Sequence, residues 1–473
     1  MLALSPFLEP RSIAVVGASA SEVKPGHIIL KNIIGNGFSG AVHPVNPRGG
    51  EILGRKAFAS ISEIPGELDL AFLVLPRQSV SSVLKEAGAC KVRAAVIVSA
   101  GFAEIGPEGR RLQAELEEIA RLTGIRCLGP NTIGLLNRPQ NLVATFIPFT
   151  DWQDGPISLM GQWGIFAGAL GDELMHRESQ RLGIGKNVSF GNMMDVDEVD
   201  FLEYCTQDPK TGVLGIHVEG MRRPELFFSQ AQDVSRTKPV ILLKSGRTAQ
   251  GADAASRHTG RVATDEALVR EGVARSGVVR ARNLDEFLAF LLGFDRQPLP
   301  PGGRVAVLSY SGGSNVLAVD ELTEEGLVPA RLSAETRRRV GNLLPDWQPV
   351  FDPADIGVAQ GHENKKTHRE ALAAVLDDPG VDAVLYILCV VPNSDFDGVA
   401  ETFGDAISKH PEKPVLLVGM GGAVKRNWLR EVEDTRLPMY ATTALAARTL
   451  GAMHHLAEFR KTSQGAPESE GSN

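Results

Sequence analysis

Short apolar runs that end in small residues recur along the chain, and each is followed by a stretch with helical spacing. The runs are rich in Val, Ile, Leu and Ala without strict alternation, which is typical of strands buried on both faces of a parallel sheet. Between them, segments such as 108–124 place Leu112, Leu116 and Ile119 on one helix face. Alternating strands and helices predict doubly wound α/β domains. The apolar runs lie at residues 12–19, 94–101, 155–164, 213–220, 239–246, 304–313 and 414–422.

Breaks in this pattern divide the chain into three units of similar size. Residues 141–155 are irregular and lead into a new strand, and the Pro- and Gly-rich segment 295–303 is typical of a linker between domains. The tail 461–473 is polar and is predicted to be disordered. We expect the three domains at residues 8–140, 155–295 and 303–457.

The composition is that of a globular protein that buries real cores, with 43% hydrophobic and 22% charged residues. The net charge of −8 argues against a nucleic-acid-binding surface, which needs clustered Lys and Arg. The first residues lack the pattern of a secretory signal, and no apolar run is long enough for a membrane span. The four cysteines form no CxxC pair, which favours a cytoplasmic protein without a cysteine-based metal site.

Glycine-rich loops follow several predicted strands, at the carboxyl ends where parallel sheets bind ligands. Glycine lets the backbone approach a phosphate there, and a helix N-terminus offers free N–H groups. None of the loops carries the dinucleotide fingerprint GxGxxG or the P-loop pattern. Any single loop is equally explained by a tight strand-to-helix turn. The loops are 17–19, 99–101, 161–164 and 312–313.

In the first unit five such loops follow one another and should converge on one edge of one sheet. They are Gly17-Ala-Ser19, His43-Pro-Val-Asn-Pro47, Leu73-Val-Leu-Pro76, Ser99-Ala-Gly-Phe-Ala-Glu104 and Leu128-Gly-Pro-Asn-Thr-Ile-Gly134. This succession closely resembles the CoA-binding domain of the acyl-CoA synthetases that form a nucleoside diphosphate, the group that includes succinyl-CoA synthetase. The resemblance implies that the loops surround CoA, with Arg48 either at a CoA phosphate or solvated in its turn. The other implied CoA contacts are Gly17, Ala18, Ser19, Asn46, Pro47, Pro76, Ser99, Ala100, Gly101 and Asn131.

One of the ten histidines, His258, lies in a polar, Gly- and Ala-rich segment after the predicted strand that ends at Lys244. Packing gives no reason for a histidine there, although an exposed histidine is most often a plain surface residue. In the same family a strand ending in Lys-x-Gly-Arg precedes an Ala-rich loop and a Ser-His-Thr-Gly motif whose histidine is phosphorylated. Here the motif reads Arg257-His258-Thr259-Gly260, with arginine in place of the serine. The resemblance implies that His258 is the phosphorylated nucleophile, carried on a loop.

Imidazole suits this chemistry, because its ordinary pKa of about 6.5 leaves a ring nitrogen free to attack an acyl phosphate at neutral pH. Glu219, at the end of a predicted strand, matches the family's carboxylate that hydrogen-bonds this histidine; the alternative is a surface acid. His217 points to the same side of that strand and is a rival nucleophile of lower rank.

In the family the phosphate rests at a helix N-terminus that opens with Ser-x-Ser-Gly. This chain instead has Gly161, Gln162, Trp163 and Gly164. Backbone N–H groups bind phosphate without side-chain hydroxyls, so the four residues remain the implied phosphate site. We expect Trp163 to affect the efficiency of phosphorylation or the size of the acyl pocket. The acids in 188–204 resemble the family's Gly-Asn-x-x-Asp-Val-Asp stretch, and a solvated helix start is favoured over a metal site.

The resemblance implies a Rossmann-like CoA-binding domain followed by two flavodoxin-like domains of the succinyl-CoA synthetase type. In the third unit, Ser311-Gly-Gly313 and Asp352-Pro-Ala-Asp355 stand near the family's Gly-Gly and Asn-Pro-x-Asp positions. Three α/β units use the whole chain and leave no room for an ATP-grasp domain. A separate ATP-grasp subunit would therefore bind ATP, ADP or GDP with Mg²⁺, in a hetero- or homo-oligomer.

The implied function is that of an acid–thiol ligase. It would interconvert a small carboxylic acid, CoA and ATP with acyl-CoA, ADP and inorganic phosphate, through an acyl phosphate and a phosphohistidine. The altered loop 161–164 favours an alternative, a non-catalytic CoA- or acyl-CoA-binding protein on the same fold. An NAD-dependent oxidoreductase is disfavoured by the missing fingerprint, and a thioester mechanism at Cys205 or Cys389 by their apolar, predicted buried positions.

Overall fold

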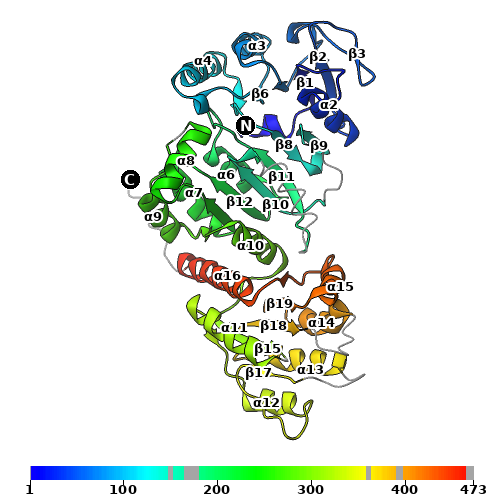
Figure 1. The fold of residues 1–473 in the computed structure, drawn as a ribbon, viewed down its shortest axis with the longest axis vertical. Coiled ribbons are helices and arrows are strands. Elements are labelled where there is room, and N and C mark those ends of the chain that lie inside the picture. Colours follow the sequence, from blue (N-terminus) through cyan, green and yellow to red (C-terminus); the bar gives the residue numbers. More distant parts are fainter. Residues whose placement is uncertain are drawn as a thin grey trace. The chain divides into compact units, whose positions relative to one another are not determined.

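The computed structural model describes residues 2–147, 153–164, 180–260, 262–309, 311–357, 364–389 and 398–464. The chain divides into two compact units, one of residues 1–175 and 182–280 and one of residues 176–181 and 281–473. Figure 1 shows the order of elements from the blue amino-terminal end to the red helix α16 (Thr443–Gln464). None of the described helices is long and apolar enough to cross a bilayer.

The first sheet has five parallel strands in the order β2-β1-β5-β6-β7. Every residue of β1, β5 and β6 is buried, because strands covered on both faces must be apolar throughout; the predicted parallel sheet is confirmed here. Helices α3 and α4 pack against each other (Figure 1). The strands are β1 (Ser12–Val16), β2 (Ala41–Val45), β5 (Leu70–Leu73), β6 (Ala94–Ile97) and β7 (Arg126–Leu128), with a small hairpin of β3 (Glu51–Ile52) and β4 (Arg55–Lys56). The helices and 3-10 turns are α1 (Ser5–Leu8), α2 (Pro25–Gly35), η1 (Ile61–Glu63), α3 (Arg77–Ala89), η2 (Ala103–Ile105) and α4 (Pro107–Thr123).

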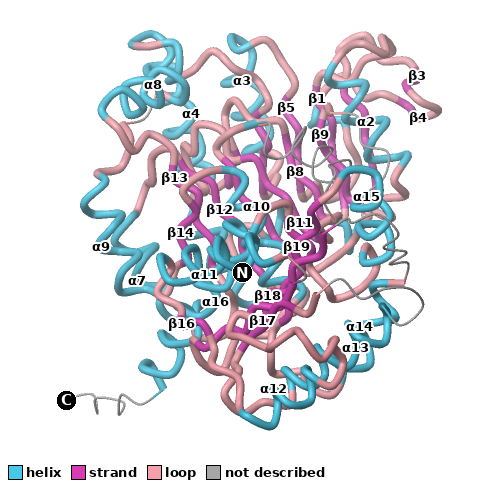
Figure 2. Tube along the Cα trace, turned by 60° about the horizontal axis from the view of Figure 1, so that its bottom comes forward, coloured by secondary structure: helices cyan, strands magenta, loops and turns pink. Residues whose placement is uncertain are grey.

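The second sheet has seven strands in the order β14-β13-β12-β10-β11-β8-β9. Its centre is parallel, with β10 between β11 and β12, and β13 beside β12. The strands are β8 (Gly134–Asn137), β9 (Leu142–Thr145), β10 (Ile157–Gly161), β11 (Ile184–Ser189), β12 (Val213–Val218), β13 (Val240–Lys244) and β14 (Val279–Ala281). The helical elements are η3 (Arg138–Gln140), α6 (Glu198–Gln207), α7 (Pro224–Ser235), α8 (Ala249–Thr259) and α9 (Glu266–Ser276). Figure 2 shows the magenta strands β11, β12 and β13 with the helices beside them.

One edge of this sheet differs from the sequence prediction. Strand β8 pairs antiparallel with both β11 and β9, so residues 134–145 form a hairpin. From the sequence we expected parallel strands only, and an irregular segment that begins at residue 141. The run Leu142-Val-Ala-Thr145 is fully buried, and Asn141 turns the chain with a φ of 52°. A run of four residues is too short to show a strand by periodicity alone, which is why this prediction was wrong.

The second unit contains a parallel sheet in the order β16-β15-β18-β19-β20, with β17 paired to β15. Its strands are β15 (Arg304–Ser309), β16 (Val328–Pro329), β17 (Ala354–Asp355), β18 (Ala383–Cys389), β19 (Val415–Met420) and β20 (Met439–Tyr440). Its other helices are α10 (Leu284–Arg296), α11 (Gly312–Glu324), α12 (Ala334–Gly341), α13 (Asn364–Leu376), α14 (Val399–Ser408) and α15 (Gly422–Val432). Residues 461–464, expected in a disordered tail, continue helix α16, and the rest of that tail lies outside the described residues.

Candidate functional site

The loops expected to surround CoA all lie at the carboxyl edge of the first sheet, and hydrogen bonds join neighbouring loops. The amide of Asn46, after β2, donates to the carbonyl oxygen of Ala18, after β1, at 2.8 Å. The hydroxyl of Ser99, after β6, donates to the carbonyl oxygen of Leu75 at 2.5 Å. The N–H of Asn131, after β7, donates to the carbonyl oxygen of Ser99 at 2.9 Å. The structure therefore brings the predicted loops together.

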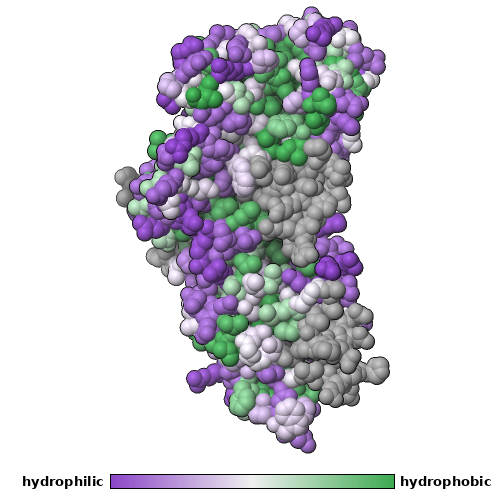
Figure 3. Space-filling view, viewed as in Figure 1, coloured by the Kyte–Doolittle hydropathy of each residue, from purple (hydrophilic) through white to green (hydrophobic). Residues whose placement is uncertain are grey.

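The remaining predicted CoA residues occupy the same edge. Pro76 precedes the first turn of α3, and Arg48 is exposed beside Pro47, with its N–H donating to the Asn46 side chain. Gly17 has a φ of 92°, and a Cβ there would lie 2.1 Å from the carbonyl oxygen of Val74. Only glycine fits this position, since a side chain would separate two neighbouring strand ends. Ser19 lies in the loop after β1, and Ala100 and Gly101 lie in the loop after β6, at the same edge. The surface over α4 and α8 is mainly hydrophilic (Figure 3).

His258 lies in the last turn of helix α8, not in a loop as the sequence predicted. The segment is rich in alanine, a strong helix former; the Thr248 hydroxyl caps its start and Gly260 ends it in the left-handed conformation. The ring Nδ1 of His258 is 2.9 Å and 3.1 Å from the two carboxylate oxygens of Glu219, which follows β12. The predicted histidine–carboxylate pair is therefore present.

The electrostatics of this pair favour a proton on the imidazole. The hydrogen bond that the His258 ring donates to Glu219 raises the pKa of His258; partial burial opposes this, and the charges of Glu219 and Glu104 add to the rise. When Nδ1–H donates to the carboxylate, the ring orientation is fixed and Nε2 remains as the nucleophilic nitrogen. The His258 side chain is 52% exposed, against 10% for Glu219, so a reactant can reach the ring.

The rival nucleophile, His217, is enclosed within β12. It is 2% exposed, its Nε2 lies 2.9 Å from the hydroxyl of Ser245, and its ring centroid lies 6.0 Å from that of Trp163. Burial lowers the pKa of His217 to about 4, which keeps it neutral at physiological pH. An enclosed ring cannot reach an acyl phosphate, so the histidine that can react at this end of the sheet is His258.

The loop predicted to hold phosphate follows β10, which Gly161 ends. The side chain of Gln162 is buried, and its Oε1 accepts the N–H groups of Glu219 at 2.5 Å and Gly220 at 3.0 Å. Trp163 is partly exposed beside His217, and Gly164 lies against Ile133. Gln162 thus fixes the backbone that carries the Glu219 carboxylate, a contact between neighbouring strands that sequence spacing did not reveal.

One polar residue beside these loops, Glu104, was missed by sequence reasoning. Glu104 stood within a quoted loop, yet it was not selected because only its glycine neighbours suggested a ligand. Its carboxylate accepts the N–H of Gly101 and the side-chain amide of Asn192. A glycine followed three residues later by an acid allows the acid's carboxylate to accept the N–H of the glycine. That spacing was the only signal in the sequence.

The acids around α6 have a structural role. Asp197 caps the helix by accepting the N–H groups of Val199 and Asp200, and it pairs with Arg223 at 2.6 Å. The predicted helix start is confirmed, but Asp197 is buried, so the expectation of a solvated start was wrong. Across the described parts of the chain no group of three or more His, Cys, Asp or Glu residues is arranged to hold a metal ion.

The cysteines differ from each other. Cys205 is buried, and burial raises its thiol pKa to about 12, which disfavours a thiolate nucleophile. Cys389 is partly exposed at the end of β18, contrary to the expectation of full burial, because it is the last residue of its strand. Its pKa is likewise raised by burial.

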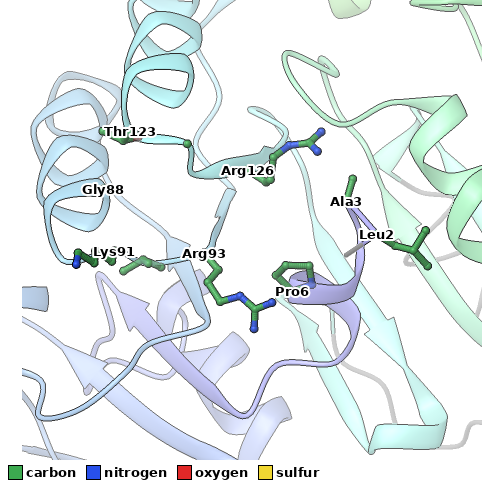
Figure 4. A pocket seen from close by; sticks show the side chains of 10 residues that line it. Leu2, Ala3, Pro6, Gly88, Lys91, Arg93, Thr123 and Arg126 are labelled. Carbon is green, nitrogen blue, oxygen red and sulfur yellow. The ribbon is translucent and has the colours of Figure 1, made fainter.

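A cavity of about 420 Å³ lies at the opposite, amino edge of the first sheet (Figure 4). Lys91, Arg93 and Arg126 line it. Arg93 pairs with Asp69 at 3.2 Å and Arg126 with Asp195 at 2.9 Å, so internal carboxylates offset both arginine charges. This cavity is separate from the loops described above.

In the second unit, both motifs noted in the sequence meet at the carboxyl end of β15. Gly312 begins helix α11, and Ala354 and Asp355 pair with Leu308 and Ser309 as strand β17. A Cβ on Gly312 would lie 3.5 Å from a carboxylate oxygen of Asp355. The two motifs therefore share one sheet edge.

Comparison with known proteins agrees with this geometry. A family model described as "CoA binding domain" matches residues 11–138, and one described as "Succinyl-CoA ligase like flavodoxin domain" matches residues 154–293. The chain is 37% identical to the alpha subunit of ADP-forming acetate–CoA ligase II of Pyrococcus furiosus, over 92% of this chain and 93% of that one. It is 34% identical to the alpha subunit of ligase I of the same organism, over 97% and 99% of the two chains.

A solved structure is similar over almost the whole chain. It is the dinucleotide-forming acetyl-coenzyme A synthetase 1 of Ca. Korarchaeum cryptofilum in complex with phosphate and ADP, with a TM-score of 0.90 and 32% identity, covering 98% of this chain and 99% of that one. Similarity of this extent supports the ligase over the non-catalytic CoA-binding protein and the NAD-dependent oxidoreductase. The chain belongs to the family of nucleoside-diphosphate-forming acyl-CoA synthetases, which are acid–thiol ligases, as an alpha-type subunit.

Proposed function

We propose that His258 is the phosphate carrier of this synthetase and that Glu219 orients its ring. The observation that carries this proposal is the pair itself, with Nδ1 of His258 2.9 Å from a Glu219 oxygen and the ring half-exposed. A histidine held by a carboxylate at one nitrogen presents the other nitrogen to phosphorus, and the carboxylate stabilises the cation that forms.

The proposed reaction runs in three balanced steps. The thioester of acyl-CoA is exchanged with inorganic phosphate, which gives acyl phosphate and releases CoA. Nε2 of His258 attacks the phosphorus, the P–O bond to the acyl group breaks, and the carboxylate leaves. The phosphoryl group then passes from His258 to ADP and forms ATP. Each step is reversible, so acid, CoA and ATP also give acyl-CoA. Positioning and charge stabilisation dominate such phosphoryl transfers.

The remaining roles follow from position. CoA would lie along the carboxyl edge of the first sheet, and the phosphoryl group would rest at residues 161–164, where Trp163 limits the acyl pocket. We propose domains at residues 8–140, 155–295 and 303–457, while β8 at the end of the first range pairs into the second sheet and α10 at the end of the second range belongs to the second compact unit. CoA contacts are proposed at Gly17, Ala18, Ser19, Asn46, Pro47, Arg48, Pro76, Ser99, Ala100, Gly101 and Asn131.

We further propose a small carboxylic acid as substrate, with acetate as the first to test, since the similar chains are named as acetate–CoA ligases. ATP or ADP with Mg²⁺ would bind to a separate ATP-grasp subunit in the cytoplasm. The naming of the relatives as alpha subunits supports a second subunit.

The test is intact-mass analysis at alkaline pH of the chain incubated with its ATP-grasp subunit, Mg²⁺ and ATP. His258→Ala is the test variant. His410→Ala is the matched control, because His410 also pairs with a carboxylate, Asp377, at 2.9 Å. We expect one acid-labile phosphoryl group on the unmodified chain and on the His410→Ala control, and none on His258→Ala. An unphosphorylated chain beside an active partner subunit, or phosphate retained in His258→Ala, would contradict the proposal.

A further inference from the structure

The carboxylate of Glu104 is the centre of a hydrogen-bond network in the first unit. Glu104 lies in the turn η2, just beyond the Ser99–Gly101 loop. Its Oε1 accepts the N–H of Gly101 at 2.5 Å, and its Oε2 accepts the N–H of Phe102 at 3.1 Å. Oε2 also accepts the side-chain amide of Asn192 at 2.7 Å. Charge-assisted bonds of this kind are about twice as strong as neutral ones, so this carboxylate determines the shape of the loop.

Asn192 extends the network to a second CoA loop. It is 1% exposed, and its N–H donates to the carbonyl oxygen of Pro130 at 2.9 Å. Its side-chain oxygen accepts the amide of Asn131 at 3.4 Å, where the backbone is left-handed with a φ of 61°. Glu104 therefore fixes both of the loops that follow β6 and β7.

The same turn supports the helix that carries the histidine. A Cβ on Gly260 would lie 2.3 Å from the carbonyl oxygen of Ala103 and 2.8 Å from the N of Glu104. Gly260 ends helix α8, two residues after His258. The end of α8 thus packs directly on η2, with no side chain between them.

We propose that Glu104 is a positioning residue that joins the CoA loops to the phosphohistidine helix, so that one carboxylate sets both the CoA affinity and the state of His258. This inference rests on the proposed function, because it assigns CoA to the first sheet and phosphate to His258. It adds a connection between the two sites through a residue that contacts neither the thioester nor phosphorus.

The electrostatics are consistent with this geometry. The groups that act on His258 are Glu219, after β12, and Glu104, in η2, and both raise its pKa. His217, also in β12, is held neutral by burial. On α8 itself, Arg257 pairs with Asp253 at 2.6 Å, so these two charges offset each other.

The test compares Glu104→Gln and Glu104→Asp with the matched control Glu118→Gln, an exposed acid on α4 that pairs with Arg121. Two quantities are measured on each full chain: the Kd for CoA by calorimetry, and the pKa of His258 by NMR, assigned with His258→Ala. Glu104→Gln removes the charge and should raise the Kd for CoA about tenfold, the effect expected from the loss of one charge-assisted hydrogen bond. It should also lower the pKa of His258. Glu104→Asp keeps the charge, but its shorter side chain moves the carboxylate oxygens away from the N–H groups of Gly101 and Phe102. CoA binding should therefore weaken, while the pKa of His258 should change less than in Glu104→Gln.

The two readouts separate the alternatives. A residue that merely shapes the CoA loop would change the Kd alone, and one that merely lies near the histidine would change the pKa alone; either result overturns the inference. So does a Glu104→Gln chain that matches Glu118→Gln in both. Absence of CoA binding or phosphorylation in the unmodified chain is a different failure, that of the proposed function. Thermal unfolding of both Glu104 variants checks that they fold.

Discussion

At the scale of single residues, the site depends on one carboxylate facing one imidazole. Glu219 is nearly buried, and its backbone N–H is held by Gln162, so its side chain has little freedom to leave His258. A fixed partner loses less entropy on forming the hydrogen bond than an exposed one would. This is why an ordinary strand-terminal acid suffices to fix the tautomer and raise the pKa of a half-exposed histidine.

We predict that Glu219→Gln lowers the pKa of His258 and slows its phosphorylation by on the order of 100-fold, because an amide cannot stabilise the imidazolium. The pair raises the folded-state pKa, so its stabilisation is present below the unfolded pKa of about 6.5 and is lost as pH rises through the higher folded value. NMR titration and urea unfolding at pH 5.5 and 8.5 check both effects; the stability difference should stay below about 1 kcal/mol, since the ring is half-exposed.

The control for this prediction is Asp377→Asn, which removes the carboxylate partner of His410. It should leave phosphorylation and the pKa of His258 unchanged. A Glu219→Gln chain that phosphorylates at the normal rate would show that the carboxylate is not needed.

At the scale of elements, the end of helix α8 explains why glycine follows His258 and Thr259 in the sequence. Gly260 is required for two separate reasons, a φ of 68° and the close approach of the Ala103 carbonyl oxygen. Gly124 ends helix α4 in the same left-handed conformation, with a φ of 75°, but a Cβ there would meet nothing within 4 Å. The two glycines therefore separate the effect of backbone strain from that of steric overlap.

We predict that Gly124→Ala costs about 1–2 kcal/mol of stability, the strain of a left-handed alanine alone. Gly260→Ala should cost more and also slow phosphorylation of His258, because the end of α8 must move off η2. Thermal unfolding and the phosphorylation rate are measured on both variants. Equal losses of stability with normal phosphorylation in Gly260→Ala would show that the packing of α8 on η2 is unimportant.

At the scale of the whole molecule, each unit contains a deeply buried histidine whose pKa is lowered by that burial. Burial lowers the pKa of His217, in the first unit, to about 4. In the second unit it lowers the pKa of His368, which hydrogen-bonds the Tyr386 hydroxyl, to about 3. The unfolded chain takes up these protons near pH 6.5 and the folded chain does not, so both units lose stability as the pH falls below that value.

We predict that each of these histidines steepens acid unfolding by up to about 1.4 kcal/mol per pH unit between pH 6.5 and its folded pKa. His217→Gln should flatten the pH dependence of unfolding of the first unit and His368→Gln that of the second. Urea unfolding is followed at pH 7, 6 and 5, with His410→Gln as the control for a partly exposed histidine. An unchanged slope in either variant would mean that the ring is protonated when folded.

Much of the site could be predicted from local sequence. Glycines and small polar residues after apolar runs place Gly17, Asn46, Ser99 and Asn131 at one sheet edge, because the carboxyl ends of parallel strands coincide. The hairpin 134–145 could not be predicted, since its strands are short and the edge they extend is defined only once β11 is in place. The helix around His258 was mistaken for a loop because its polar, Gly-containing sequence obscures its helical spacing.

The sequence by itself determined the doubly wound class and the order of the loops at the sheet edge, and its resemblance to a family singled out His258, because each rests on residues close together in the chain. Only the tertiary structure decided which long-range pairs form. It brought Gln162 onto Glu219, Asn192 onto Glu104, and Gly260 onto Ala103, and it enclosed His217. These contacts join residues 57, 88 and more than 150 positions apart. The first contact depends on which strands are neighbours in the second sheet, and the other two depend on elements of the first sheet meeting elements of the second within one compact unit. A pattern of apolar and polar positions does not carry that information.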